Sequence, residues 1–199
     1  MFSKLLIANR GEIALRIQRA CRELDIATVA VYSEADKDLM HVKMADESIC
    51  IGPPDAEQSY LNVPSIISAM ELSGAEAVHP GYGFLSEDSN FAEKVERSGF
   101  RFVGPTSKII KKMGNKVSAL DFAEKIGMKV LPGSKETVAG FSDAMNIIEE
   151  IGFPVIIKAT SGGGGKGLRV VDSEENLKRG IEMAGKESQR AFGDSRIYL

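Results

Sequence analysis

Apolar residues in the first half of the chain form short continuous runs, and the segments between the runs have helical spacing. Runs of this length are typical of strands buried in a parallel sheet. We predict such strands at Lys4–Ala8, Thr28–Tyr32, Ser48–Ile51, Ala75–His79 and Phe100–Gly104. From Gly11 onward, apolar positions recur three or four residues apart, which predicts a helix. Because strands that alternate with helices form parallel βαβ units, residues 1–112 are predicted to form a doubly wound α/β domain.

The pattern changes after Pro105, where two helical segments meet at Gly114–Asn115. We interpret residues 113–129 as a helical connector. Residues 130–199 are predicted to form one compact α+β unit with the order helix, strand, glycine-rich loop, strand, long helix and strand. The last strand runs to Leu199 without a polar tail, so we expect the chain to be part of a longer protein.

Composition limits the class of protein. Of the 199 residues, 43% are hydrophobic and 27% are charged, as in an ordinary globular domain. The net charge of -3 and the pI near 5.6 argue against binding to nucleic acid or to a membrane surface. No apolar segment is long enough for a membrane span. Cys21 and Cys50 both stand among apolar neighbours, so we expect two reduced core thiols in a cytoplasmic protein.

A glycine-rich loop, Gly162–Gly167, follows a predicted strand. Each interior glycine costs about 0.5–1 kcal/mol of extra conformational entropy, so the run is expected where the backbone approaches another group closely. A Walker A loop does not fit, because Thr160 stands where its first glycine is required and Gly167 where Ser or Thr is required. The dinucleotide fingerprint fits in spacing, but a strand follows instead of a helix. A hairpin that covers phosphates with backbone amides fits this context better.

Two lysines are candidates for an anion site. Lys158 ends the apolar run before the glycines, and a lysine in a buried apolar strand is destabilising unless it faces an anion. A phosphate there would accept charge-assisted hydrogen bonds. The alternative is a surface hairpin on which Lys158 extends into water. Lys116 begins a predicted helix, where its charge opposes the helix dipole, and its simplest interpretation is a solvated lysine.

The loop after the fourth strand, His79–Glu87, is rich in turn residues. Its proline and glycines account for the turn, and Ser86 or Asp88 is available as the N-cap of the next helix. The loop also follows the carboxyl end of a parallel strand, where open α/β sheets bind ligands. We interpret His79 itself as a packed residue. The first βα turn has only one glycine, Gly11, so no dinucleotide site is expected there.

Four segments of the chain resemble the biotin carboxylases, which are the biotin-carboxylating subunits or domains of acetyl-CoA, pyruvate and related carboxylases. The segments are Lys4–Ile17, His41–Ser48, Ala77–Glu87 and Phe153–Val171, and the resemblance extends over the whole chain. It implies an N-terminal Rossmann-like α/β domain, the pre-ATP-grasp domain. The start of an ATP-grasp domain with a small α+β lid would follow from residue 130.

The resemblance also implies an ATP site. In the biotin carboxylases, lysines at the positions of Lys116 and Lys158 bind ATP phosphates. Glycines at the positions of Gly163, Gly164 and Gly165 close over the nucleotide. By resemblance, the glycine run is therefore a hinged lid of backbone amides over ATP.

The implied reaction is the carboxylation of biotin on a biotin carboxyl carrier protein. ATP phosphorylates bicarbonate to carboxyphosphate, whose decomposition delivers CO2 to biotin, with Mg2+ or Mn2+ bound to the nucleotide. The loop with Tyr82 and Gly83 would face the biotin end of the active site. Carboxyltransferase subunits or domains are the further implied partners. The catalytic residues and metal ligands of the family lie beyond Leu199, so none is assigned in this chain.

The polar face of the first helix, with Arg16, Arg19 and Glu23, is expected to be solvated. Bacterial members of the family use this region for homodimer contacts, so the resemblance also implies a homodimer. Two other functions stay open. One is another ATP-grasp ligase of the carbamoyl-phosphate or purine-pathway type, against which the segment Ala77–Glu87 argues. The other is a non-catalytic nucleotide-binding module.

Overall fold

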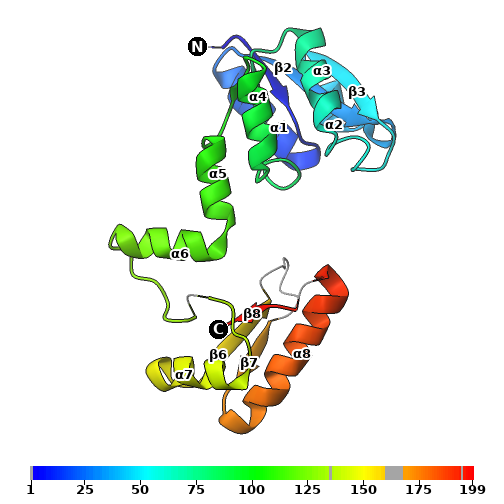
Figure 1. Ribbon diagram of the computed structural model, residues 1–199. Helices are drawn as coiled ribbons and strands as arrows, with labels where there is room; N and C mark the ends of the chain where they lie inside the picture. The colour runs from blue at the N-terminus through cyan, green and yellow to red at the C-terminus, as the bar shows by residue number, and fades with distance from the viewer. Residues whose placement is uncertain (1, 135, 160–167, 194) are drawn as a thin grey trace. The chain divides into compact units, whose positions relative to one another are not determined.

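The computed structural model describes residues 2–134, 136–159, 168–193 and 195–199. It divides into two compact units, Met1–Asn115 and Lys116–Leu199, whose elements are drawn in Figure 1. The boundaries expected from the sequence, with a connector at 113–129, stay predictions. Within the described ranges, no helix combines the length and the apolar character that a membrane span requires.

The first unit is built on a five-stranded parallel sheet in the order β3-β2-β1-β4-β5. Its strands are β1 (Lys4–Ile7), β2 (Ala27–Ser33), β3 (Glu47–Gly52), β4 (Ala77–His79) and β5 (Arg101–Phe102). The register pairs Leu6 of β1 with Val29 of β2 and with Val78 of β4. The five strands predicted from the apolar runs are therefore confirmed, as is their parallel arrangement.

Helices cover both faces of this sheet. They are α1 (Gly11–Glu23), α2 (Met40–Lys43), α3 (Val63–Ser73) and α4 (Ser89–Arg97), and a further helix, α5 (Ser107–Gly114), packs against α4. Because successive strand residues point to opposite faces, β1 buries Leu5 and Ile7 in the cluster with α1 and Leu6 in the cluster with α3 and α4. Full burial of each such side chain contributes about 1.5–3 kcal/mol. The alternation of apolar residues along one strand thus holds helices on both sides of the sheet (Figure 1).

Side-chain caps determine where two of these helices begin. The Oδ1 atom of Asp88 accepts hydrogen bonds from two backbone N–H groups in the first turn of α4, at 2.8 and 3.2 Å. Of the two predicted N-cap candidates, Ser86 and Asp88, the structure therefore selects Asp88. At α3, the side chain of Asn62 accepts a hydrogen bond from the N–H of Ser65 at 3.1 Å. Such caps stabilise a helix by about 0.5–2 kcal/mol each.

The second unit contains a three-stranded antiparallel sheet in the order β7-β6-β8. Its elements are α6 (Lys116–Lys125), α7 (Phe141–Ile151), β6 (Val155–Ala159), β7 (Arg169–Val171), α8 (Glu174–Phe192) and β8 (Ile197–Tyr198). Helices α7 and α8 pack on one face of the sheet, where Val155, Ile157 and Val171 are buried. The predicted order of elements in this α+β unit is confirmed for the described residues.

The opposite face of the small sheet, called its open face below, carries exposed apolar side chains among the described residues. Ile156 and Val170 lie opposite each other on β6 and β7, and they are 45% and 72% exposed. Strand β6 therefore alternates between buried and exposed side chains. The expectation that this apolar run is buried along its length is wrong, because a run of apolar residues does not show whether one or both faces of its sheet are covered.

A hydrogen-bond network around Asp36 joins the ends of several elements in the first unit. The Oδ2 atom of Asp36 accepts hydrogen bonds from the guanidinium of Arg10 at 2.9 Å, the hydroxyl of Tyr60 at 2.7 Å and the hydroxyl of Ser33 at 3.1 Å. Burial by itself would raise the pKa of Asp36, but these hydrogen bonds outweigh it and hold the pKa below its ordinary value. Burial and the bond to Asp36 raise the pKa of Tyr60 to about 12, so the phenol keeps its proton.

The two cysteines differ in exposure. Cys21 of α1 is buried, whereas Cys50 of β3 is exposed, and both are free thiols. The prediction of two core cysteines is therefore right for Cys21 and wrong for Cys50. Strand β3 lies at the edge of the sheet, and Cys50 is on its exposed side although its neighbour Ile51 is buried.

The Asp36 network is tested by the substitution Asp36→Asn. We expect the free energy of unfolding at neutral pH to fall by about 1.5–3 kcal/mol, because hydrogen bonds to charged groups contribute this much. The folded-state pKa of Asp36 lies below its ordinary value of 3.8. The stabilisation is therefore complete well above pH 3.8 and is lost as the pH falls through the folded-state pKa. Urea denaturation at neutral and acid pH measures both effects.

Asp38→Asn is the matched control, because Asp38 is exposed and lies two residues from Asp36. A surface substitution of this kind changes stability by no more than about 0.5 kcal/mol. Equal stability of the two variants at neutral pH would contradict the stabilising role of the network.

The difference between the cysteines predicts their reactivity toward a thiol reagent such as DTNB. Cys50 is expected to react fast in the folded protein. Cys21 is expected to react only when the unit unfolds, because its thiol is buried and out of reach of the reagent. Burial, with a smaller contribution from Asp46, also raises the pKa of this thiol. Absorbance at the wavelength of the released thiolate measures both phases. Cys50→Ser should remove the fast phase, and a fast phase that persists in this variant would refute the assignment.

Candidate functional site

The strand order of the first sheet creates a point where ligands bind in open α/β folds. The order reverses between β1 and β4, because α1 follows β1 on one face of the sheet and α4 follows β4 on the other. A crevice at such a reversal, outside the carboxyl ends of the strands, is the usual ligand position in this class. The segments that meet there are Ala8–Glu12, after β1, and Pro80–Phe84, after β4. The second contains the predicted site residues Tyr82 and Gly83.

The side chain of Asn9 joins these two segments. The strand ladder ends where the N–H of Ala8 donates to the carbonyl of His79 at 2.9 Å. One residue later, the side-chain amide of Asn9 donates to the carbonyl oxygens of Pro80 and Tyr82, both at 2.8 Å. Asn9 is only 3% exposed. A side chain thus continues the pairing of β1 with β4 after the backbone ladder has ended.

The backbone of the second segment bends in a way that favours glycine. Gly81 and Gly83 have φ values of +67° and +64°, in the left-handed region. At Gly81, a Cβ atom would also lie 2.8 Å from the side-chain nitrogen of Asn9, so no larger residue fits without a shift. Phe84 follows with a φ of +42°. The loop therefore has a defined shape, and Gly81 allows the close approach of Asn9.

The side chain of Tyr82 lies at the surface of this loop. It is 60% exposed, and its hydroxyl donates a hydrogen bond to the carboxylate of Glu12. This bond is the main cause that raises the pKa of Tyr82, so the phenol is protonated at neutral pH. The structure thus places Tyr82 and Gly83 at the strand-order reversal, with the aromatic ring accessible to a ligand.

His79 is held as part of the same turn. Burial lowers its pKa, and its Nδ1 atom accepts a hydrogen bond from the N–H of Gly81 at 3.0 Å. A neutral imidazole that serves as an acceptor for its own loop is suited to support the turn. The interpretation of His79 as a packed residue agrees with this geometry.

In the second unit, Lys158 lies on the open face of the small sheet. It pairs with Tyr198 of β8, and it is two residues from Ile156 and therefore on the same face of β6. Val170, opposite Ile156, extends this face onto β7. The side chain of Lys158 is partly exposed. The structure thus joins one cation to an exposed apolar surface.

The other predicted nucleotide residues are less fully described. Lys116 is the first residue of α6, as predicted, but its side chain is outside the described part of the structure. Gly163, Gly164 and Gly165 lie outside the described residues altogether. The structure therefore gives the position of Lys158 on its sheet and leaves the assignment of the glycine lid to the sequence.

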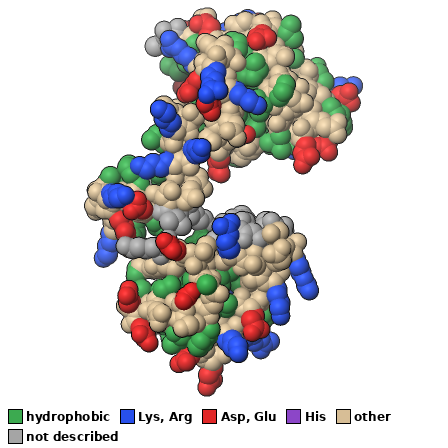
Figure 2. All heavy atoms as spheres, in the orientation of Figure 1, with side chains coloured by type: hydrophobic (Ala, Val, Ile, Leu, Met, Phe, Trp, Pro, Cys, Tyr) green, Lys and Arg blue, Asp and Glu red, His purple; other side chains and the backbone are tan. Residues whose placement is uncertain are grey.

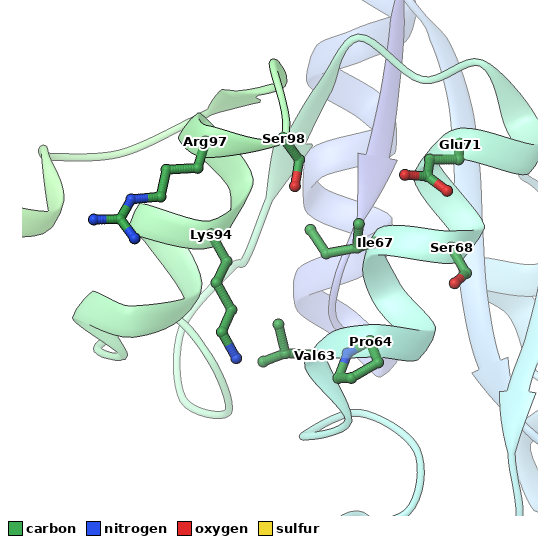
Figure 3. A pocket seen from close by; sticks show the side chains of 8 residues that line it. All are labelled: Val63, Pro64, Ile67, Ser68, Glu71, Lys94, Arg97 and Ser98. Atoms are coloured by element: carbon green, nitrogen blue, oxygen red, sulfur yellow. The ribbon is translucent and has the colours of Figure 1, made fainter.

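A surface groove of about 430 Å³ lies between α3 and α4, away from the predicted site residues (Figure 3). Val63, Pro64 and Ile67 of α3 form its apolar side. The side chain of Lys94 extends toward them from α4, and Glu71 lies further along α3. None of the residues named above as site candidates lines this groove, so we assign no part of the chemistry to it.

Charged side chains of both signs are mixed on the face of each unit that Figure 2 shows. The described residues contain no group of three His, Cys, Asp or Glu side chains that could hold a metal ion.

Sequence reasoning missed the role of the first βα turn. It considered only the glycine of that turn, whereas the structure shows that the side chains of Asn9, Arg10 and Glu12 contact the loop or its supports. The signal available in the sequence was Asn9 itself, an amide side chain directly after an apolar strand. A second loop follows β4 at the same edge of the sheet. The pairing of the two loops was not visible without the strand order.

The comparisons with known proteins cover the whole chain. Residues 1–110 match the family described as biotin carboxylase, N-terminal domain, and residues 115–199 match the carbamoyl-phosphate synthase L chain, ATP binding domain. The biotin carboxylase of Haemophilus influenzae is 55% identical over 200 residues, which cover 100% of this chain and 45% of the relative. A pyruvate carboxylase subunit of Methanothermobacter thermautotrophicus is 47% identical over 199 residues, which cover 100% of this chain and 40% of the relative.

A solved structure gives the same result. The biotin carboxylase domain dimer of Hydrogenobacter thermophilus 2-oxoglutarate carboxylase, in complex with MgADP, ADP and bicarbonate, is similar with a TM-score of 0.88 and 45% identity. The match covers 100% of this chain and 44% of that one, so this chain spans less than half the length of these relatives.

The predicted fold class is thereby confirmed. It is an N-terminal Rossmann-like doubly wound parallel sheet followed by the start of an ATP-grasp domain with a small α+β lid. The N-terminal family match alone covers more than half of the chain, and the relatives align with all of it. The chain belongs to the biotin carboxylase family.

Proposed function

We propose that this chain is part of an enzyme that carboxylates biotin at the expense of ATP and bicarbonate. The observation that carries the proposal is that the whole of this chain matches relatives named for different carboxylases, at 55% and 47% identity. Such carboxylases differ in the final acceptor of the carboxyl group and share the step in which biotin is carboxylated. In this proposal, the region that aligns with both relatives therefore serves the shared step.

ATP is proposed to lie on the open face of the sheet β7-β6-β8. The exposed side chains of Ile156 and Val170 offer an apolar surface to the nucleotide, and Lys158 offers a cation to its phosphates. Burial of exposed apolar surface and charge-assisted hydrogen bonds would both favour binding there. Lys116 is assigned to the phosphates as well, and the backbone amides of Gly163–Gly165 are assigned as their cover.

The proposed reaction has two stages. An oxygen of bicarbonate attacks the γ-phosphorus of ATP, the bond to ADP breaks, and carboxyphosphate forms. Carboxyphosphate then separates into CO2 and phosphate, and the deprotonated ureido nitrogen of biotin attacks the carbon of CO2. Lys158 and Lys116 would contribute by neutralising phosphate charge as it redistributes in the first stage. Mg2+ supplies further charge neutralisation when bound. By resemblance to the family, we assign its ligands to a part of the enzyme outside this chain.

The loop at the strand-order reversal is proposed as the biotin side of the site. Tyr82 presents an exposed aromatic ring there, and Gly83 leaves the adjacent backbone uncovered by a side chain. Biotin would arrive on a biotin carboxyl carrier protein, and carboxyltransferase subunits or domains would receive the carboxylated product. A homodimer and a cytoplasmic location complete the proposal. The solved dimer of the related carboxylase domain supports the homodimer.

The ATP assignment predicts the effect of Lys158→Gln in the complete carboxylase. We expect ATP affinity to fall about 10- to 150-fold, because a charge-assisted hydrogen bond to phosphate contributes about 1.5–3 kcal/mol. The thermal stability of the protein should change little, since Lys158 is partly exposed and on the open face. The KM for ATP, measured from the rate of ADP release at saturating bicarbonate and biotin, checks the prediction.

Lys178→Gln is the control with the same loss of charge. Lys178 is an exposed residue of α8, the helix that covers the other face of the sheet. Its variant should have the KM of the unaltered enzyme. If Lys158→Gln and Lys178→Gln have the same KM for ATP, the nucleotide does not use Lys158 and the proposed ATP site is wrong.

A further inference from the structure

The segment after β1 holds the loop Pro80–Phe84 at several points. Asn9 binds two carbonyl groups of the loop, and Glu12 accepts the hydrogen bond of the Tyr82 hydroxyl. The guanidinium of Arg10 lies 5.7 Å from the ring centroid of Phe84, and the same ring stacks on Tyr60 at 5.1 Å. The side chains on both sides of Gly11 thus contact a loop about seventy residues further along the chain.

Asn9 is the central contact of this set. Its amide nitrogen has two hydrogens, and each meets a different carbonyl of the loop at 2.8 Å. Its Oδ1 atom accepts the N–H of Arg10 at 2.8 Å, so the orientation of the amide is fixed by its own backbone. The carboxylate of an aspartate has the same shape but only acceptor atoms, which would face the two carbonyl oxygens. Among side chains of this size, an amide is therefore required.

The loop depends on such a contact because its own backbone cannot easily fix its shape. Gly81 and Gly83 permit many conformations, and Phe84 has a positive φ that is uncommon for a bulky residue. The next backbone hydrogen bond within the loop region, from Ser86 to the carbonyl of Gly83, lies beyond Tyr82. The part of the loop that carries Tyr82 is therefore held by side chains: Asn9 binds two of its carbonyls, His79 accepts the N–H of Gly81, and Glu12 accepts the Tyr82 hydroxyl. Of these side chains, only Asn9 bonds to the carbonyl groups on both sides of Gly81.

We propose that Asn9 is a positioning residue that holds Tyr82 and Gly83 in place for biotin. The inference depends on the proposed function, in which this loop faces biotin. A loop held before the ligand arrives loses less conformational freedom on binding, and the ligand binds more tightly as a result. Asn9 acts through the loop and is not among the residues assigned to ATP, so we expect its effect on the biotin side.

The test uses Asn9→Asp in the complete carboxylase. Initial rates are measured with free biotin varied at saturating ATP, and then with ATP varied at saturating biotin. We expect the KM for biotin to rise about tenfold, which corresponds to about 1.4 kcal/mol. The KM for ATP should stay within about twofold of that of the unaltered enzyme, because Asn9 is not among the residues assigned to ATP. A twofold change is well below the tenfold rise expected for biotin. A purely structural role would change both constants together or neither.

Asn62→Asp is the matched control. It introduces the same charge in the same unit, but Asn62 caps α3, and aspartate serves equally well as an N-cap. Its biotin and ATP constants should equal those of the unaltered enzyme. If Asn9→Asp fails to fold, Asn9→Ala is assayed in its place, because it removes both donors without adding a charge. Hydrogen exchange at residues 82–84 should be faster in either Asn9 variant than in Asn62→Asp.

Tyr82→Ala separates failure of the inference from failure of the proposed function. If Tyr82→Ala raises the KM for biotin and the Asn9 variants do not, the loop contacts biotin and the positioning role of Asn9 is refuted. If Tyr82→Ala leaves the KM for biotin unchanged, the proposed biotin contact of the loop is itself wrong, and the inference falls with it. A parallel rise of both KM values in the Asn9 variants, with a lowered melting temperature, would also refute the positioning role.

Discussion

The reversal of strand order between β1 and β4 is the constraint on which the first unit depends. The two strands pair as far as Ala8 and His79, and their connections then turn toward opposite faces of the sheet. Carbonyl groups beyond that point have no strand neighbour and still require donors. Asn9 supplies two of these donors from its side chain. The interaction that satisfies the backbone is therefore the same one that gives the ligand loop its position.

The second unit meets a different constraint, because the helices in the described part of the chain pack on one face of its sheet only. Val155, Ile157 and Val171 form a core with α7 and α8, and this burial holds the unit together. The residues on the other face, such as Ile156 and Val170, gain nothing from that core. Apolar side chains exposed side by side are favourable sites for a ligand with apolar surface. The open face is thus consistent with a unit that completes its packing when a nucleotide binds.

Much of the fold could be predicted from local pattern, because strand and helix signals are carried by neighbouring residues. The apolar runs located all five parallel strands, and the break at Gly114–Asn115 separated α5 from α6. Exposure could not be predicted in the same way. Cys50 and Ile156 stand in apolar runs and are nevertheless exposed, because the edge position of β3 and the open face of β6 are properties of the assembled sheets.

In the candidate site, too, some residues could be identified from local pattern and others only from the assembled fold. The position of Lys158 at the end of an apolar run points to an anion site. The same position suggests that its charge is buried, whereas the structure shows a partly exposed side chain. The prediction of Tyr82 and Gly83 follows from the rule that ligands bind at the carboxyl ends of parallel strands, and the structure gives the position of their loop. Asn9 could not be found in this way, because its function depends on two carbonyls that are distant in sequence. Local chemistry is visible in a sequence, whereas a contact between two loops requires the topology.

The two proposed binding regions use conformational freedom in opposite ways. The loop with Tyr82 is held by hydrogen bonds from Asn9 and Glu12, so little order has to be gained when biotin binds. The proposed cover for ATP consists of consecutive glycines, the residues that lose the most conformational freedom when they are ordered. For residues of this kind, contacts with the nucleotide must offset that loss, whereas the loop with Tyr82 already has its contacts within the first unit.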